Sequence, residues 1–127
     1  MSQQKKIKPT ESELEILHVL WQKGHATVRE VYEEISQSKD IGYTTALKLM
    51  QIMFEKGLVT RDDSTRSHIY KALVSREATQ QQLVGKMIQS LFAGKASGLV
   101  LQALGNHIAS QEELEEIQKM LDDLKKG

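Results

Sequence analysis

Hydrophobic residues at helical spacing dominate the first third of the chain, in two segments that each open with a capping box. Thr10 and Glu13 form the first capping pattern, and Gly24 marks the end of that predicted helix. Thr27 and Glu30 repeat the pattern at the start of a second, shorter helix. The apolar faces of the two helices consist of Leu14, Ile16, Leu17, Val19, Leu20 and Trp21, and of Val28, Val31, Tyr32 and Ile35.

The segment of residues 42–57 is predicted to form a third helix with two contrasting faces, and Gly57 supplies its end. One face is apolar and carries Ala46, Leu47, Leu49, Met50, Met53 and Phe54. The other face carries Thr44, Thr45, Lys48, Gln51 and Glu55, with Ile52 among them. Short hydroxyls, an amide and a cation suit a helix in a DNA major groove, where base edges and phosphates are the partners. An ordinary solvated helix face is the alternative interpretation.

Strand-forming residues follow this helix in two runs, LVTRDD at 58–63 and SHIYKALV at 67–74, around a polar turn. This pattern predicts a β-hairpin. The expected strand residues are Leu58, Val59, Ile69, Tyr70 and Leu73. Three helices followed by a hairpin with a basic tip indicate a winged helix-turn-helix. The predicted fold is therefore mostly α, with a winged-helix DNA-binding domain at residues 1–74.

Residues 75–127 have a different pattern and are predicted to form a helical dimerisation domain. Ser75 starts a helix with one apolar stripe, the stretch 93–98 interrupts that stripe with two glycines, and residues 99–104 form a short apolar helix. Ser110 caps a last helix that has a coiled-coil-like apolar seam. This much apolar surface is difficult for about 50 residues to bury alone.

Two arrangements would cover that apolar surface: the helices wrap around the first domain, or they pair with the same segment of a second chain. Pairing is favoured, because a dimer places two DNA-reading domains about one DNA turn, or a multiple of it, apart. The residues expected at the dimer interface are Leu83, Met87, Leu91, Leu101, Leu104, Leu114, Ile117, Leu121 and Leu124.

Composition narrows the functional class. The 127 residues include 17 basic and 17 acidic side chains, which argues against indiscriminate coating of nucleic acid but allows a local basic stripe. The chain has no cysteine, which excludes disulfides and thiolate metal sites. The polar and basic residues 1–9 are expected to be mobile and do not resemble a secretory signal. Without a stretch long enough to cross a bilayer, a cytoplasmic protein without a membrane partner is expected.

The residues give no support to catalysis. The histidines His18, His25, His68 and His107 are isolated and lack metal-ligand spacing. There is also no nucleophile motif and no phosphate-binding glycine loop. We therefore expect no enzymatic activity, no metal and no cofactor.

Several motifs in register carry a family resemblance. Leu20, Trp21 and Gly24 are followed by TVREV at residues 27–31, YTTALKLM at 43–50, KGLVTR at 56–61, and the pair Arg66 and Tyr70. With these motifs in this order, the chain resembles the penicillinase-repressor (BlaI/MecI) family of bacterial winged-helix repressors over essentially its whole length.

The resemblance implies a homodimeric repressor that binds a palindromic double-stranded DNA operator, with the third helix in the major groove and the C-terminal helices forming the dimer. It makes Thr44, Thr45 and Lys48 the expected groove contacts. Tyr43 and Arg66 are expected at backbone phosphates. Each has an alternative: Tyr43 packing on the hairpin, and Arg66 serving only as a soluble turn residue.

The chain departs from the family pattern within the reading helix and in the C-terminal domain. Ile52 stands where many members carry arginine and Lys48 where many carry threonine, so Ile52 can offer only apolar contact, for instance to a thymine methyl. Ile52 buried by the hairpin is the alternative. Members under β-lactam control are inactivated by a protease of a sensor system at an Asn–Phe bond. Gln102 and Ala103 occupy that place here, so the scissile pair is absent, and the lack of cysteine excludes the copper sensing of other relatives.

Two other binding functions remain as alternatives. The first is a winged-helix protein-interaction module without sequence-specific DNA binding, which the neutral charge would fit. The polar stripe of Thr44, Thr45, Lys48 and Gln51 argues against it, because protein interfaces usually centre on aromatic or aliphatic anchors. The second is a small-molecule sensor, for which no residue pattern marks a pocket.

Overall fold

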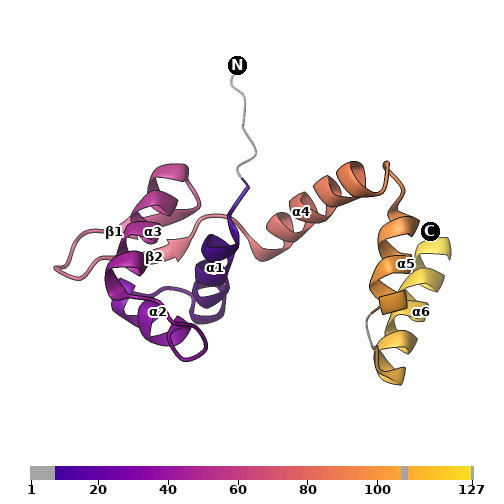
Figure 1. Cartoon of the computed structure of the whole chain (residues 1–127), viewed down its shortest axis with the longest axis horizontal. Helices are drawn as coiled ribbons and strands as arrows, with labels where there is room; N and C mark the ends of the chain where they lie inside the picture. Colours follow the sequence, from indigo (N-terminus) through magenta and orange to yellow (C-terminus); the bar gives the residue numbers. More distant parts are fainter. Residues whose placement is uncertain (1–7, 107–108, 127) are drawn as a thin grey trace, which may run out of the picture. The chain divides into compact units, whose positions relative to one another are not determined.

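The computed structural model of the chain describes residues 8–106 and 109–126. Its elements are α1 (Glu11–Lys23), α2 (Val28–Ile35), α3 (Tyr43–Lys56), β1 (Val59–Asp62), β2 (Ile69–Ala72), α4 (Arg76–Leu91), α5 (Ala96–Asn106) and α6 (Gln111–Lys126) (Figure 1). This arrangement confirms a mostly helical fold with a winged helix followed by further helices. Most of the N-terminal segment expected to be mobile, and His107, lie outside the described residues; Pro9 is described and is buried.

Both predicted capping boxes form. The Thr10 hydroxyl accepts a hydrogen bond from the Glu13 N–H at 3.2 Å, and Glu13 Oε1 accepts one from the Thr10 N–H at 2.9 Å. Thr27 and Glu30 repeat both bonds at the start of α2. Each box satisfies two backbone N–H groups that a helix start would otherwise leave unpaired. The local sequence therefore sets the beginnings of α1 and α2.

A short antiparallel hairpin forms the wing, with Val59 opposite Ala72 and Arg61 opposite Tyr70. The chain between α1 and α2 joins this sheet: the Ala26 N–H donates to the Tyr70 carbonyl at 3.0 Å, and the Tyr70 N–H donates to the Ala26 carbonyl at 2.8 Å. The strands are shorter than the β-rich runs of the sequence, and Leu73 lies beyond β2 with 58% of its surface exposed.

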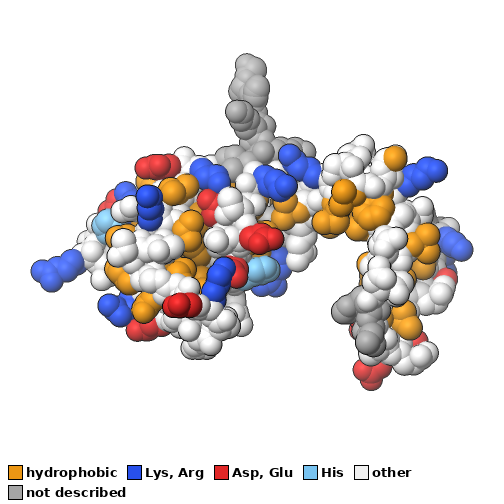
Figure 2. Space-filling model, in the orientation of Figure 1, with side chains coloured by type: hydrophobic (Ala, Val, Ile, Leu, Met, Phe, Trp, Pro, Cys, Tyr) orange, Lys and Arg blue, Asp and Glu red, His pale blue; other side chains and the backbone are white. Residues whose placement is uncertain are grey.

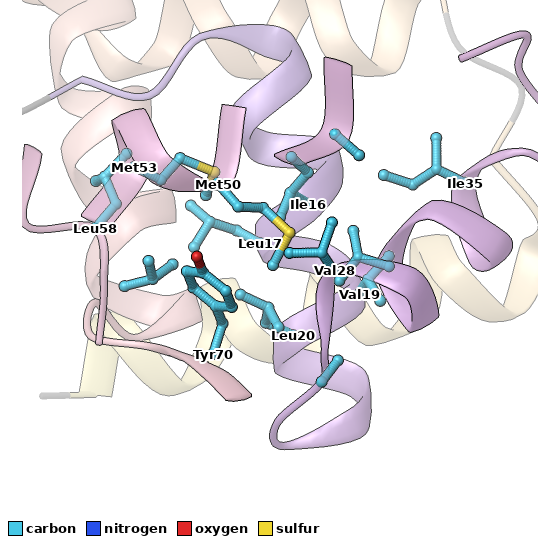
Figure 3. Packing of buried hydrophobic residues seen from close by; sticks show 14 residues of the cluster. Ile16, Leu17, Val19, Leu20, Val28, Ile35, Met50, Met53, Leu58 and Tyr70 are labelled. Carbon is cyan, nitrogen blue, oxygen red and sulfur yellow. The ribbon is translucent and has the colours of Figure 1, made fainter. Parts of the chain in front are cut away.

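The core of the head, which we define as α1, α2, α3 and the β1–β2 hairpin, is built from side chains of every one of these elements (Figure 3). Leu17 of α1, Val31 of α2, Met50 of α3 and Tyr70 of β2 are at most 1% exposed. Fully burying one aliphatic side chain of this size stabilises the fold by about 1.5–3 kcal/mol. This shared core places the polar face of α3 on the outside.

A buried ion pair fixes the far end of α3. Lys56 Nζ, in the last turn of α3, lies 2.8 Å from Glu13 Oε1 and 3.0 Å from Glu13 Oε2. The Glu13 side chain is only 3% exposed, and the same carboxylate caps α1. One carboxylate therefore serves as a helix cap and as the link between α1 and α3.

The apolar arc of α3 is confirmed except at Phe54. Ala46, Met50 and Met53 are buried, whereas Phe54 is 38% exposed. The guanidinium of Arg61, on β1, lies 4.2 Å from the centre of the Phe54 ring. Because the hairpin supplies this cation, Phe54 is covered by a cation–π contact and does not enter the core. Gly57 ends α3 with φ 84°, as predicted.

The chain divides into two compact units at Leu83 and Val84, within α4. The predicted division at residues 74 and 75 stays a prediction. The short apolar helix expected at residues 99–104 is longer than predicted, because Ala96 to Gly98 join it and Gly105 and Asn106 extend it. Among the described residues, no helix is both long and apolar enough to span a membrane.

Candidate nucleic-acid interface

The outward face of α3 presents the polar residues that the sequence singled out. Thr44, Thr45, Lys48 and Gln51 are exposed, and Ile52 is half-buried. Lys48 makes no hydrogen bond or ion pair with any described residue, so its ammonium is available to a ligand. The structure therefore places along one helix a polar surface whose side chains have no partner elsewhere in the described part of the chain.

Tyr43 starts α3 and packs against α2. Its ring meets the Tyr32 ring edge-on, with 5.8 Å between centroids and an interplanar angle of 79°. The Arg29 guanidinium lies 5.3 Å from the centre of the Tyr43 ring. Tyr43 keeps 40% of its surface exposed. Packing of Tyr43 on the hairpin was the alternative expected from the sequence. In the structure its ring contacts are with α2, and part of the side chain is open to solvent.

A cleft of about 580 Å³ is lined by residues of α2, of α3 (Tyr43, Leu47 and Gln51) and of the hairpin. It brings Arg66 of the hairpin together with Tyr43 and Gln51 of α3. Its lining residues are Thr27, Val28, Arg29, Glu30, Glu33, Tyr43, Leu47, Gln51, Arg61, Arg66, Ser67, His68 and Tyr70. Thr44, Thr45, Lys48 and Ile52 are not part of this lining. Lys and Arg side chains appear at several places on the surface of the head (Figure 2).

Arg61 anchors the hairpin side of the cleft. Its Nε–H donates to Asp63 Oδ1 at 2.8 Å while the guanidinium covers Phe54. Hydrogen bonds to Tyr70 and to Asp63 raise the pKa of Arg61 above its ordinary value. The residue is therefore always charged, and its ion pair within the hairpin positions it against α3.

The turn of the hairpin is held by its own polar groups. Asp62 accepts a hydrogen bond from the Ser64 N–H at 2.9 Å, which lowers the pKa of the Asp62 carboxyl. The Thr65 hydroxyl donates to the Ser67 carbonyl at 2.6 Å. Arg66, between Thr65 and Ser67 in the sequence, is exposed and makes no hydrogen bond or ion pair with any described residue. The turn therefore presents one uncommitted cation beside the cleft.

Arg29 and Arg61 also line the cleft, and the sequence analysis did not single them out. Arg29 lies in the first turn of α2, two residues after the Thr27 cap. The capping pattern at Thr27 could have drawn attention to it. Arg61 carried no comparable signal, because its contact with Phe54 joins two elements of different type.

The residues expected at a dimer interface are mostly exposed in the single chain. Leu91 is 70% exposed, Leu101 71% and Leu124 77%. Met87, Leu104, Leu114 and Leu121 are also exposed, whereas Ile117 and Leu83 are half-buried. Hydrophobic side chains are visible on the surface of α4 and of the α5 and α6 helices (Figure 2). Exposed apolar side chains in this number are typical of surfaces that bind another protein.

Gln102 and Ala103, the residues at the place of the family cleavage bond, lie within α5 and are exposed. The Gln102 side-chain carbonyl accepts a hydrogen bond from Asn106 Nδ2 at 2.9 Å.

Three helices, a two-stranded wing and an exposed polar third helix define the chain as a winged-helix protein with a helical C-terminal segment. The model of the penicillinase-repressor family matches residues 9–123, and the chain belongs to this family. Members of this family are transcriptional repressors and not enzymes, which confirms the expectation that the chain is not a catalyst.

Named relatives agree with this family. The methicillin resistance regulatory protein MecI of Staphylococcus aureus (strain N315) is 26% identical over 111 residues, which cover 87% of this chain and 90% of MecI. The penicillinase repressor of Staphylococcus aureus is 21% identical over 122 residues, covering 96% of this chain and 97% of that protein. The transcriptional regulator BlaI of Mycobacterium tuberculosis (strain CDC 1551 / Oshkosh) is 27% identical over 115 residues, covering 88% and 81%.

Proposed function

We propose that this chain is a sequence-specific DNA-binding repressor that acts as a homodimer on a palindromic operator. The observation that carries this proposal is the exposed, uncommitted polar face of α3 next to an arginine-lined cleft. That combination supplies groups for reading base edges and groups for holding the phosphate backbone on one side of the head.

The base-reading role falls to the outward face of α3. Thr44 and Thr45 can exchange hydrogen bonds with base edges, and Lys48 can reach a guanine edge or a phosphate. Gln51 can pair with adenine, and Ile52 can contact a thymine methyl. Because these five side chains differ from the usual family set at two positions, this operator has its own sequence.

The phosphate-binding role falls to the edges of the same surface. Arg66 on the hairpin and Arg29 on α2 line the same cleft. Tyr43 also lines it and offers a phenol hydroxyl. Contacts of this kind fix the register of a protein on the duplex and make binding depend on salt.

The dimer is formed by the apolar surface of α4, α5 and α6. Side chains as exposed as Leu91 and Leu124 lose contact with water when a second copy covers them. A two-fold dimer uses the same surface on both copies and matches the symmetry of a palindromic operator. Two heads bound to one promoter exclude RNA polymerase from it.

The test is selection of duplexes from a random-sequence library by the full-length protein. We expect enrichment of one palindromic sequence and, when that sequence is placed in a promoter, repression of a reporter gene by the protein. A selection that enriches no sequence would contradict the proposal. It would instead favour a winged helix whose partner is another protein.

A further inference from the structure

The segment that joins β2 to α4 is held at every residue. The Leu73 N–H donates to the Leu58 carbonyl at 2.9 Å, which ties the segment to the turn between α3 and β1. The Val74 side chain packs on the core of the head. Ser75 directly precedes α4, so only residues 73–75 lie between the hairpin and the first turn of that helix.

Trp21 of α1 holds the middle of this segment. Its indole Nε1–H donates to the Val74 carbonyl at 2.9 Å, across a sequence separation of 53 residues. The Arg76 guanidinium lies 5.8 Å from the centre of the Trp21 ring, and the His18 ring meets Trp21 edge-on at 5.4 Å. The indole therefore contacts the residues on both sides of Ser75.

The first turn of α4 is equally well fixed. Ser75 Oγ accepts a hydrogen bond from the Ala78 N–H at 3.0 Å, and its carbonyl accepts one from the Thr79 hydroxyl at 2.8 Å. Thr79 is only 4% exposed. The head therefore continues into α4 through bonded and packed residues.

We propose that Trp21 is a positioning residue for the recognition of paired half-sites, because it holds the first turn of α4 on the head. This inference rests on the proposed function, in which α4 belongs to the dimer segment. A head that is held firmly to its dimer segment can reach a second half-site at only one spacing along the DNA. A loosely held head can reach a second half-site at several spacings, but its effective concentration at each of them is lower.

The experiment uses the duplex that the wild-type protein selects from a random library, its isolated half-site, and versions with the spacer lengthened or shortened. Trp21→Phe keeps an aromatic ring and removes the indole donor together with the five-membered ring that carries it. We expect unchanged affinity for the isolated half-site. At the preferred spacing, affinity should fall about three- to tenfold, as the loss of one hydrogen bond predicts, and the discrimination against other spacings should shrink.

Ile16→Val is the matched control, because it removes one methyl group from a fully buried core residue without touching the joint. It costs about as much stability as one hydrogen bond and should leave the spacing profile unchanged. If Trp21→Phe does not fold by circular dichroism, insertion of two glycines between Val74 and Ser75 replaces it. A broadened profile in that variant supports the proposal.

Three results overturn the inference in distinguishable ways. A wild-type protein that binds selected and shuffled duplexes equally overturns the proposed function and the inference together. A wild-type protein that prefers the selected duplex but tolerates every spacing overturns the inference alone. A wild-type spacing profile in Trp21→Phe also overturns the inference alone. If the glycine insertion is used in its place, a wild-type profile in that variant has the same meaning.

Discussion

Recognition of base sequence depends on a few side chains at the residue scale, and Lys48 is the central one. It is exposed and uncommitted in the structure, and it is the only cation on the outer face of α3 among the described residues. A lysine in that position can serve a guanine edge, which carries sequence information, or a phosphate, which does not. The two roles predict different effects of its removal.

We predict that Lys48→Ala weakens binding to the selected duplex by about 1–3 kcal/mol, roughly 5- to 150-fold, if the lysine reads a base. Discrimination against a change at the contacted base should shrink at the same time. Fluorescence anisotropy on the selected and single-base-changed duplexes measures both. The control is Lys23→Ala, an exposed lysine in the last turn of α1 that does not line the cleft. Equal losses in the two variants would contradict a reading role.

Thr44→Ala tests the neutral part of the same face. Removal of one hydroxyl from a base contact is expected to cost about 1 kcal/mol in affinity for the selected duplex and nothing for shuffled DNA. Sedimentation should show the dimer unchanged, because Thr44 lies on the head. An equal loss on both duplexes would assign Thr44 to the backbone.

Arg29 belongs to the phosphate-binding set, so its replacement has a different signature. Arg29→Gln should weaken binding to selected and shuffled duplexes about equally and lower the salt slope of the binding constant by about one. Affinity titrations over a range of salt concentrations measure that slope. Because Arg29 also covers Tyr43 at 5.3 Å, circular dichroism should verify that α3 is intact. An unchanged slope would exclude Arg29 from the DNA backbone.

At the element scale, the position of α3 depends on contacts at its two ends. Tyr43 packs on α2 at the start, and Lys56 pairs with the buried Glu13 at the end. The chain provides a matched comparison for the second contact. Lys39 and Glu15 form an ion pair of nearly the same length, 3.0 Å, but their side chains are 49% and 45% exposed.

Lys56→Gln is therefore expected to lower the free energy of unfolding by about 1–3 kcal/mol, because it leaves a buried carboxylate without its charged partner. Lys39→Gln should cost at most about 1 kcal/mol, since water screens an exposed pair. Urea unfolding followed by circular dichroism compares the two midpoints. Equal effects would show that burial of Glu13 does not strengthen the pair.

The elements of the head were predictable from the sequence where the signal is local. The capping boxes at Thr10 and Thr27 and the stop at Gly57 depend on residues within a few positions of each other. The ion pair of Glu13 and Lys56 joins residues 43 positions apart, and nothing local marks it. Phe54 was predicted on the apolar face, because periodicity reports only the side of a helix on which a residue lies. The cation that lies over its ring comes from β1.

The candidate interface was predictable only in part for the same reason. Periodicity predicted the outward face of α3, and the structure confirms that Thr44, Thr45, Lys48 and Gln51 are exposed. The cleft that gathers Arg29, Arg61 and Arg66 arises from three elements packed together. Their roles in DNA binding, and those of the dimer residues, stay predictions.

At the scale of the whole molecule, function requires two chains. The seam of α6 is exposed in the single chain, with Leu121 46% and Leu124 77% exposed. Ile117 lies half-buried on the same seam. A charged side chain introduced into a paired seam loses its hydration without gaining a partner, and this destabilises the pair.

Leu121→Lys is therefore expected to shift the protein from dimer to monomer and, through the loss of the second head, to weaken binding to the palindromic duplex. Affinity for an isolated half-site should not change. Glu115→Lys is the control, because Glu115 is exposed and lies on the face of α6 opposite the seam. Analytical ultracentrifugation gives the oligomeric state. A Leu121→Lys protein that stays dimeric would remove α6 from the interface.

The most direct test of sequence-specific recognition is an anisotropy titration of the wild-type protein on the selected duplex and on its shuffled version, repeated at several salt concentrations. The proposed function predicts binding at least about 10³-fold tighter to the selected duplex at physiological salt. Both affinities should fall as salt rises, while the preference persists. Equal binding to the two duplexes at every salt concentration would contradict a role as a sequence-specific repressor.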